Sequence, residues 1–262
     1  MKFILIYILI LLIIILFYKY KTKYEYFVEE NNIIFLSDKE TSKVITNTSD
    51  YFSRFNKYDL IARKVNSLNE YLDKISQVSI NLTDDKKDII IKCIEIIDNE
   101  LIHQINENWI NNNKLKQIKW KIGIINMDIY EAGLPHTRND TIIIPYKQIK
   151  FTKNFINTLL HEKLHVYQKM YPEDFNIYLQ ENNFEKYIKY INSNIPYRSN
   201  PDTDDWIYKK NNQLYKSEYK TLDFCLDSIL DVKYYPQDNC KYEHPTEESV
   251  YNLLKKIKIK NT

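Results

Sequence analysis

Residues 161–165 read His-Glu-Lys-Leu-His, and this segment constrains the fold more than any other part of the chain. On an α-helix, side chains four positions apart lie on the same face, so His161 and His165 can direct a ring nitrogen at one divalent ion. Glu162 is turned about 100° from His161, which places its carboxylate beside the ion without making it a ligand. The segment therefore predicts a helix that carries two zinc ligands and a general base.

The metal-binding helix is expected to begin near Thr152 and to stop before Pro172, because proline disfavours helical geometry at the residue that precedes it. A rigid support is what a preorganised metal site needs. The far side of the helix supplies it with four apolar side chains that we expect in a core: Ile156, Leu159, Val166 and Met170.

A third metal ligand must come from elsewhere, because zinc in a catalytic site usually takes three protein ligands and leaves a fourth position for water. The extended metzincin pattern would require Gly at position 168 and His at position 171, where the chain has Gln168 and Tyr171. A Glu at the start of a later helix is the better candidate. Glu247 is preferred and Glu248 is the alternative, although both could simply stabilise a helix N-terminus.

Hydrophobic periodicity in the rest of the chain predicts an α+β fold, a mostly helical domain with a small sheet. Two short runs rich in β-branched residues predict strands at Trp120–Ile125 and Thr141–Pro145. Apolar spacing predicts further helices at 53–77, at 83 to about 112, at 175–191 and from Thr246 onward.

Charge and cysteine content exclude some classes of protein. Lys and Arg total 37 and Asp and Glu total 35, a net charge of +2 that gives no support for a nucleic-acid partner. The three cysteines show no Cys-x-x-Cys spacing, so neither a disulfide framework nor a thiolate zinc site is indicated. Cys93 lies on an apolar helical pattern and is expected to be buried and inert, whereas Cys225 and Cys240 could pair in an oxidising compartment.

The first residues of the chain form an apolar run in which every side chain from Phe3 to Phe17 is apolar or aromatic. Tyr18 extends the run, and as a helix from Phe3 to Tyr18 it would cover roughly 24 Å, which spans a thin bilayer if the flanking Lys2 and Lys19 snorkel outward. A cleaved signal peptide would need a pair of small residues as a cleavage site after the apolar run, and none follows it. Residues 1–23 are therefore expected to be an uncleaved transmembrane anchor.

Lysine placement predicts the orientation of this anchor. Lys19, Lys21 and Lys23 follow the apolar run, whereas only Lys2 and the amino terminus precede it, so the remainder of the chain is expected on the cytoplasmic side. Three Asn-x-Ser/Thr sequons point the other way, but an Asn-rich chain forms them by chance; they begin at Asn47, Asn81 and Asn139.

Four segments together carry a resemblance to a known group: Gly133-Leu134-Pro135-His136-Thr137, residues 158–168 around the His-Glu-Lys-Leu-His motif, Asn200-Pro201-Asp202 and His244-Pro245-Thr246-Glu247. This combination resembles gluzincin-like metallopeptidases of large DNA viruses and some algae, over roughly residues 120–251. The resemblance implies that Glu247 is the third ligand. Val250 stands where that group often has a small residue.

The resemblance implies a zincin-like catalytic domain at 119–262, and we expect it to pack with a helical region at 24–118 as one globular unit. The expected function is a membrane-anchored zinc metallopeptidase in a host or virion membrane. In it, Glu162 acts as general base toward a zinc-activated water, and a peptide or protein is the substrate. Strand 141–145 would present an edge to the substrate, and His136 or Tyr208 would stabilise the oxyanion.

Two other functions stay open at this point. One is a membrane-tethered, non-catalytic zinc-binding protein with a structural or interaction role. The other is an envelope-disrupting module that uses the lysine-rich tail, residues 255–260, although such a run usually is a solvated helix end.

Overall fold

The computed structural model describes residues 32–48, 51–189, 195–220, 228–236 and 242–259. The chain divides into two compact units, residues 1–34 and 35–262. Of the first unit only residues 32–34 are described, where strand β1 (Ile33–Phe35) begins. The predicted anchor, residues 1–23, lies outside the described residues, and no helix within them is long and apolar enough to span a bilayer. The predicted domain limits at 23 and 118 stay predictions.

The described part of the second unit is a mixed fold of eight α-helices and two small sheets, consistent with the predicted α+β class. In one sheet β4 (Thr141–Pro145) lies between β2 (Trp120–Ile125), its parallel neighbour, and β3 (His136–Arg138), its antiparallel neighbour. The other sheet is antiparallel, in the order β5 (Glu185–Lys189), β6 (Trp206–Lys210), β7 (Gln213–Tyr219) and β8 (Val232–Tyr235).

Both predicted strands, β2 and β4, are confirmed to the residue. Every side chain of β4 is buried, as expected for a β-branched run inside a sheet. The prediction that β4 presents an edge is wrong, because β2 and β3 pair with it on both sides. The short strand β3, which the sequence pattern did not reveal, follows β2 and β4 in the sheet order.

The predicted helix at 53–77 is wrong as a single helix. The segment contains α3 (Lys57–Ala62) and α4 (Leu68–Ile75), preceded in the chain by α2 (Asp38–Ile45). Lys64 adopts a left-handed φ of 56°, and the Ser67 hydroxyl then accepts a hydrogen bond from the amide of Glu70 and caps α4. The two helices bury side chains in different clusters: Tyr58 and Ala62 of α3 pack with Tyr219, Ile229 and Val232, whereas Tyr71 and Ile75 of α4 pack in the cluster around Ile45.

Two other predicted helices differ from the observed ones at their ends. Helix α5 (Asp84–Ile96) starts as expected after Thr83 and continues as a π-helical and a 3-10 turn to Gln104, and α6 (Asn112–Gln117) follows in the Asn-rich segment. The predicted helix 175–191 begins earlier and ends earlier, as α8 (Pro172–Glu181). Pro172 occupies its first turn, where a missing amide hydrogen costs nothing.

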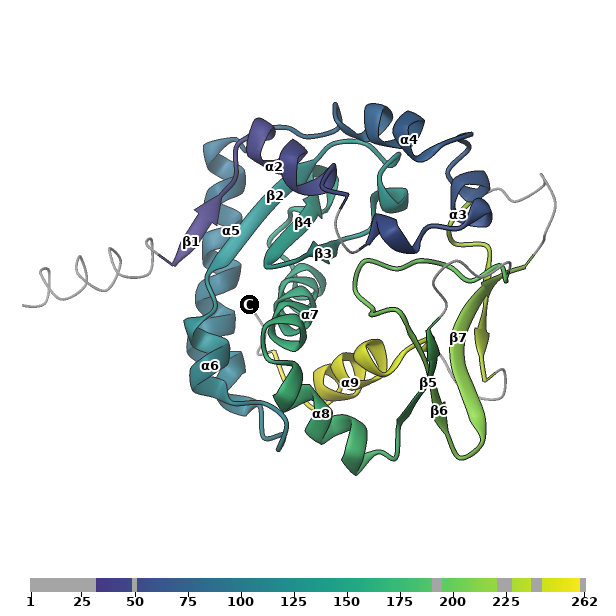
Figure 1. The fold of residues 1–262 in the computed structure, drawn as a ribbon. Coiled ribbons are helices and arrows are strands. Elements are labelled where there is room, and N and C mark those ends of the chain that lie inside the picture. Colours follow the sequence, from purple (N-terminus) through teal and green to yellow (C-terminus); the bar gives the residue numbers. More distant parts are fainter. Residues whose placement is uncertain (1–31, 49–50, 190–194, 221–227, 237–241, 260–262) are drawn as a thin grey trace, which may run out of the picture. The chain divides into compact units, whose positions relative to one another are not determined.

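The helix with the His-Glu-Lys-Leu-His motif is α7 (Lys153–Met170), which begins after Thr152 and ends before Pro172 as predicted. The Thr152 hydroxyl caps it by accepting a hydrogen bond from the amide of Phe155. It packs against β3 and β4 on one side and against α5, α6, α8 and α9 (Pro245–Leu254) on others, so it lies at the centre of the unit (Figure 1). The expected apolar flank is buried except for Met170, which is 47% exposed because it ends the helix.

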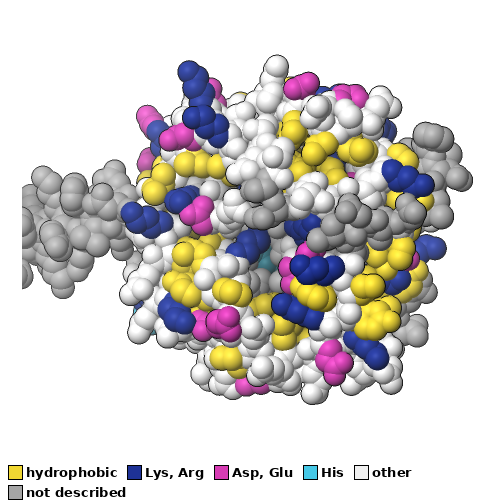
Figure 2. All heavy atoms as spheres, in the orientation of Figure 1, with side chains coloured by type: hydrophobic (Ala, Val, Ile, Leu, Met, Phe, Trp, Pro, Cys, Tyr) yellow, Lys and Arg dark blue, Asp and Glu magenta, His cyan; other side chains and the backbone are white. Residues whose placement is uncertain are grey.

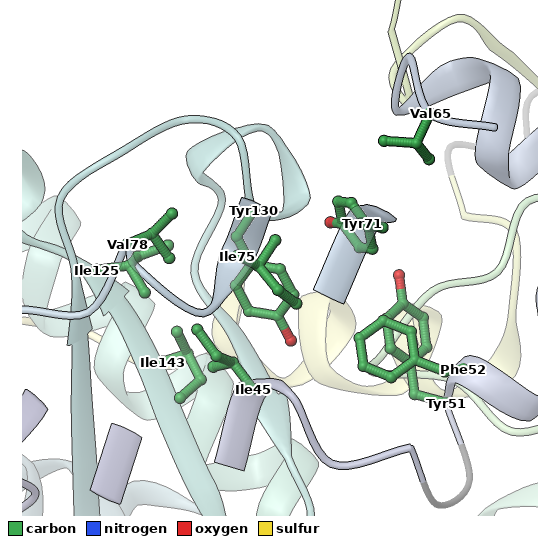
Figure 3. Packing of buried hydrophobic residues seen from close by; sticks show 10 residues of the cluster. All are labelled: Ile45, Tyr51, Phe52, Val65, Tyr71, Ile75, Val78, Ile125, Tyr130 and Ile143. Atoms are coloured by element: carbon green, nitrogen blue, oxygen red, sulfur yellow. The ribbon is translucent and has the colours of Figure 1, made fainter. Parts of the chain in front are cut away.

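A cluster of buried apolar side chains joins α2 and α4 to the sheet that contains β2 and β4. Figure 3 shows its side chains converging from α2, α4, β2, β4 and the segments between them; they are Ile45, Tyr51, Phe52, Val65, Tyr71, Ile75, Val78, Ile125, Tyr130 and Ile143. All ten are less than 8% exposed. The sheet is thus held between α7 and this cluster, which gives the metal-binding helix a fixed support.

Cys93 is fully buried on α5, as predicted, and burial raises the pKa of its thiol to about 12, which leaves it protonated and inert. Cys225 and Cys240 lie outside the described residues, so their predicted ability to pair stays a prediction.

Candidate metal centre

Three of the predicted site residues meet at one point. The Nε2 atoms of His161 and His165 lie 2.9 Å apart. The Glu247 carboxylate, from the first turn of α9, lies with one oxygen 3.4 Å from His161 Nε2 and the other 3.4 Å from His165 Nε2. Helices α7 and α9 pack against each other, and this packing brings the distant carboxylate to the two imidazoles.

This group has the geometry to hold a metal ion. Its candidate ligand atoms all lie within 4.8 Å of one another, and four ligands at about 2.05 Å from a tetrahedral zinc ion stand about 3.3 Å apart. Two imidazole nitrogens and one carboxylate oxygen are a donor set that zinc takes in catalytic sites. The side chains of His165, His161 and Glu247 are 0%, 14% and 14% exposed, so an ion held there would be largely shielded from water.

Glu248, the alternative third ligand, is bound elsewhere. Its Oε1 accepts hydrogen bonds from the hydroxyl of Tyr178 and from Nζ of Lys210, both at 3.3 Å. Adjacent residues on a helix differ by about 100° in direction, so only one of the two glutamates can face α7. Glu247 is that residue.

The charges of the three groups support one another. Burial by itself raises the pKa of Glu247, but the charge of His165 and hydrogen bonds from His161 and His165 hold that pKa well below its usual range. Burial likewise lowers the pKa of His165, and the negative charge of Glu247 more than reverses this. The carboxylate is therefore ionised and available as a ligand.

Gln168 fixes the orientation of one imidazole. His165 Nδ1 donates to Gln168 Oε1 at 2.8 Å, so Nε2 is the ring nitrogen that faces Glu247 and His161 and that would bind an ion there. The amide nitrogen of Gln168 donates to Thr246 O and to Ser249 Oγ, both on α9. One buried amide thus connects a candidate ligand on α7 with the helix that carries Glu247.

Glu162, the predicted base, lies beside the cluster and lines an adjacent cavity of about 470 Å³ together with His161 and Glu247. It is 4% exposed, and its Oε2 has no hydrogen-bond partner among the described residues. Burial, and then the negative charge of Asp202, raise the pKa of Glu162 well above its usual range. A buried carboxylate oxygen without a partner is uncommon, and such groups concentrate at functional sites.

The cavity has a polar interior and an apolar rim. In the space-filling view, histidine is visible in a hollow of this face (Figure 2). Four partly exposed apolar or aromatic side chains lie on the cavity wall: Leu134, Leu230, Tyr234 and Tyr251. The Tyr251 ring also meets His161 edge-on, with the ring centres 4.9 Å apart.

His136 lines the cavity, but its hydrogen bonds do not suit an oxyanion donor. Nδ1 lies 2.9 Å from the carbonyl of Leu134 and must carry a proton to bond there, which leaves Nε2 of the neutral ring as an acceptor. Nε2 is buried and has no partner within the described residues. Burial lowers the pKa of His136, which disfavours the doubly protonated ring that could donate.

Tyr208, the other predicted oxyanion group, is not among the residues that line the cavity. Its side chain is buried, its hydroxyl donates to Asp204 Oδ2 at 2.7 Å, and its ring packs edge-on against His244. The structure therefore brings His136 to the cavity, whereas the Tyr208 ring packs against His244, the residue that precedes α9.

Several residues of the site were missed by sequence reasoning. Tyr251 could have been found, because it stands four positions after Glu247 and so on the same helix face. Gln168 stands three positions after His165 and could have been found in the same way. Arg198 and Glu243 also line the cavity, from segments outside helices and strands, and no periodic signal marks them.

Comparison of the chain with protein-family models, with curated proteins and with solved structures finds no match in any of the three.

Proposed function

We propose that this chain is a zinc-dependent metallopeptidase of the gluzincin-like group that its motifs resemble. One observation carries the proposal: two imidazoles from α7 and a carboxylate from α9 converge at 3.4 Å or less, beside a cavity that the Glu162 carboxylate lines. A closed structural zinc site would need a fourth protein ligand. Among the described residues the only group of His, Cys, Asp and Glu found able to hold a metal has three members, which favours an open site.

The proposed mechanism assigns each residue one task. His161, His165 and Glu247 hold the ion, and Gln168 keeps the His165 ring in the tautomer that binds through Nε2. Bound zinc would polarise the scissile carbonyl and make the attacking water more acidic. Glu162 takes the proton of that water and then delivers it to the leaving amine. Its buried, unpartnered Oε2 suits this exchange, because nothing else in the described chain competes for the proton.

The candidates for the oxyanion donor differ in whether they line the cavity and in their hydrogen bonds. His136 lines the cavity, but in its neutral form it would accept rather than donate through Nε2. Tyr208 has its hydroxyl on Asp204 and is therefore left out of the proposed chemistry. Tyr251, four positions beyond Glu247 and against His161, is the nearer hydroxyl-bearing side chain.

We further propose that residues 1–23 anchor the enzyme in a host or virion membrane, with the catalytic domain on the cytoplasmic side. The support is the apolar run from Phe3 to Phe17 and the lysines that follow it. Fractionation of cells that express the full chain, followed by protease protection, tests both the anchor and its orientation.

Zinc analysis and peptide hydrolysis of the full chain together test the function. We expect one zinc per chain and cleavage of a pool of unstructured peptides, followed by mass spectrometry. Glu162→Gln should keep the zinc and lose about 100-fold or more in rate, because general base catalysis is worth that much. Glu247→Ala should lose the zinc, and Glu248→Ala is its matched control and should keep it.

Two outcomes would contradict the proposal in different ways. Full activity of Glu162→Gln would refute the assignment of the base. Stoichiometric zinc together with no cleavage of any peptide in the pool would favour the alternative, a membrane-tethered zinc protein with a structural or interaction role.

A further inference from the structure

Strand β3 does not offer a free edge to a substrate next to the metal centre. Thr137, its middle residue, uses both main-chain groups within the protein: its amide donates to Asp202 Oδ1 at 2.7 Å, and its carbonyl accepts from Lys169 Nζ at 3.1 Å. Lys169 also bonds the carbonyl of Pro201. A peptide that paired with β3 would have to displace a buried, charged network, so the substrate main chain must be held elsewhere.

Two further residues that line the cavity each have a buried side-chain atom without a partner among the described residues, as Glu162 and His136 do. These atoms are Nε of Arg198 and Oε2 of Glu243. Glu243 Oε1 is fully used, because it accepts from Arg198 Nη2 and from the Asn200 amide at 2.6 Å. The two side chains are 10% and 6% exposed. The ion pair therefore holds both residues in place and leaves the buried Nε of Arg198 and Oε2 of Glu243 without a partner among the described residues.

The charges of this pair limit what it can bind. Arg198 and Glu243 neutralise each other, so a free carboxylate would meet the negative Glu243 and a free amine would meet the positive Arg198. A peptide group carries no net charge and offers one acceptor and one donor, its carbonyl and its N–H. One donor next to one acceptor is complementary to such a main chain.

We propose that Arg198 Nε and Glu243 Oε2 bind the main chain of the substrate, the first to a peptide carbonyl and the second to a peptide N–H. This inference rests on the proposed function for the nature of the ligand. Because the pair favours uncharged peptide groups over chain termini, the enzyme cleaves within polypeptides and is an endopeptidase. Because the pair contacts only the main chain of the substrate, it accepts substrates with many different side chains.

Binding of a blocked peptide tests the pair without any need for turnover. The probe is acetyl-Ala-Leu-Ala-amide, titrated into the full-length, zinc-loaded Glu162→Gln protein, which binds without cleaving. A series of esters, each with one peptide N–H replaced by oxygen, is titrated alongside. We expect one ester to bind about tenfold more weakly than the amide, as for loss of a hydrogen bond to a charged group.

Variants locate the interaction. Arg198→Lys keeps the positive charge beside Glu243 but deletes Nε, and we expect it to bind the amide probe about tenfold more weakly. Glu243→Gln places an amide donor where Oε2 stood, so it should bind weakly and no longer distinguish the sensitive ester from the amide. Arg63→Lys is the matched control, because it changes another buried Arg–Glu pair whose arginine does not line the cavity.

The results separate this inference from the function on which it rests. Equal binding of the amide and of every ester would overturn the inference even if no variant folds, and so would failure of the probe to bind. At least tenfold tighter binding of the tripeptide with free termini would overturn the endopeptidase assignment. Discrimination between amide and ester without hydrolysis by the parent chain would keep the binding pair and remove the proposed function.

Discussion

Two buried charge networks lie in this protein, and they differ in how completely their atoms are used. The first joins Arg63 to Glu131 at 2.9 Å, with both side chains less than 5% exposed. Tyr51 and Tyr71 bind the same network, the first through Arg63 and the second through Glu131. None of these side chains has a buried polar atom without a partner.

The second network surrounds the metal-centre cavity, and it is incomplete. Of the eight buried side-chain atoms that lack a partner within the described residues, four belong to residues that line this one cavity; they are His136 Nε2, Glu162 Oε2, Arg198 Nε and Glu243 Oε2. Burial and the positive charge of Arg63 act in opposite directions on Glu131, and the pKa of Glu131 falls. Burial and neighbouring negative charges act together on Glu162, and its pKa rises.

The difference teaches that buried charge alone does not mark a functional site. The Arg63–Glu131 network is closed, so it can stabilise the fold but has no capacity left for a ligand. The cavity network keeps donors and acceptors unpaired at a cost in stability, which is expected where a ligand completes the bonding.

The largest effect expected from this comparison is on stability. Arg63→Met leaves the Glu131 carboxylate buried and unpaired, which should destabilise the zinc-loaded chain by about 3–5 kcal/mol in urea unfolding. Zinc affinity should not change, since Arg63 is outside the metal cluster. A loss below about 1 kcal/mol would show that the closed network is not a main source of stability, and the contrast between the networks would fail.

An intermediate effect is expected at the link between α7 and α9, the two helices that carry the candidate metal ligands. Gln168→Met keeps the size of the side chain but removes the acceptor for His165 Nδ1 and the donors to α9, so the zinc dissociation constant should rise about 10–100-fold. Competition with a chromophoric chelator measures it. Ser249→Ala removes a single acceptor of Gln168 and should have a smaller effect. An unchanged zinc affinity in Gln168→Met would mean that His165 binds the ion without the hydrogen bond to Gln168.

The smallest effect expected is a pH dependence next to α9. Burial alone raises the pKa of Asp204, but the charge of His244 and hydrogen bonds from His244, the Trp206 amide and Tyr208 lower it from 3.8 to about 2. The unfolded chain therefore binds this proton first, so the stabilisation is complete above about pH 4 and is lost as the pH falls towards 2. Asp204→Asn should flatten this part of the stability curve. If the free energy of unfolding falls equally below pH 4 in both proteins, the loss of stability comes from other carboxylates.

Local sequence patterns were sufficient for the elements that form from neighbouring residues. Helix α7 could be predicted from its expected start near Thr152, the limit at Pro172 and the four-residue spacing of His161 and His165, because all three are local features of the chain. Strands β2 and β4 were equally clear, since β-branched side chains fill a buried sheet.

The same local patterns gave the wrong answer where tertiary packing decided. The apolar spacing of 53–77 is continuous although the chain breaks into α3 and α4, and the buried side chains of these two helices join two different clusters. The spacing of β4 gives no sign of which strands pair with it, so its position inside the sheet could not be foreseen.

The sequence by itself determined the helix that carries His161, Glu162 and His165 and the face that the two imidazoles share, because their spacing on one helix is a local property of the backbone. It also supplied Glu247 as the preferred third ligand and Glu248 as the alternative, from the start of a later helix, and the resemblance pointed to Glu247 as well. Only the tertiary structure brought Glu247 to the two imidazoles, engaged both main-chain groups of Thr137 and left one atom each of Arg198 and Glu243 without a partner among the described residues. These depend on contacts between segments far apart in the chain, and no periodicity within a segment encodes such contacts.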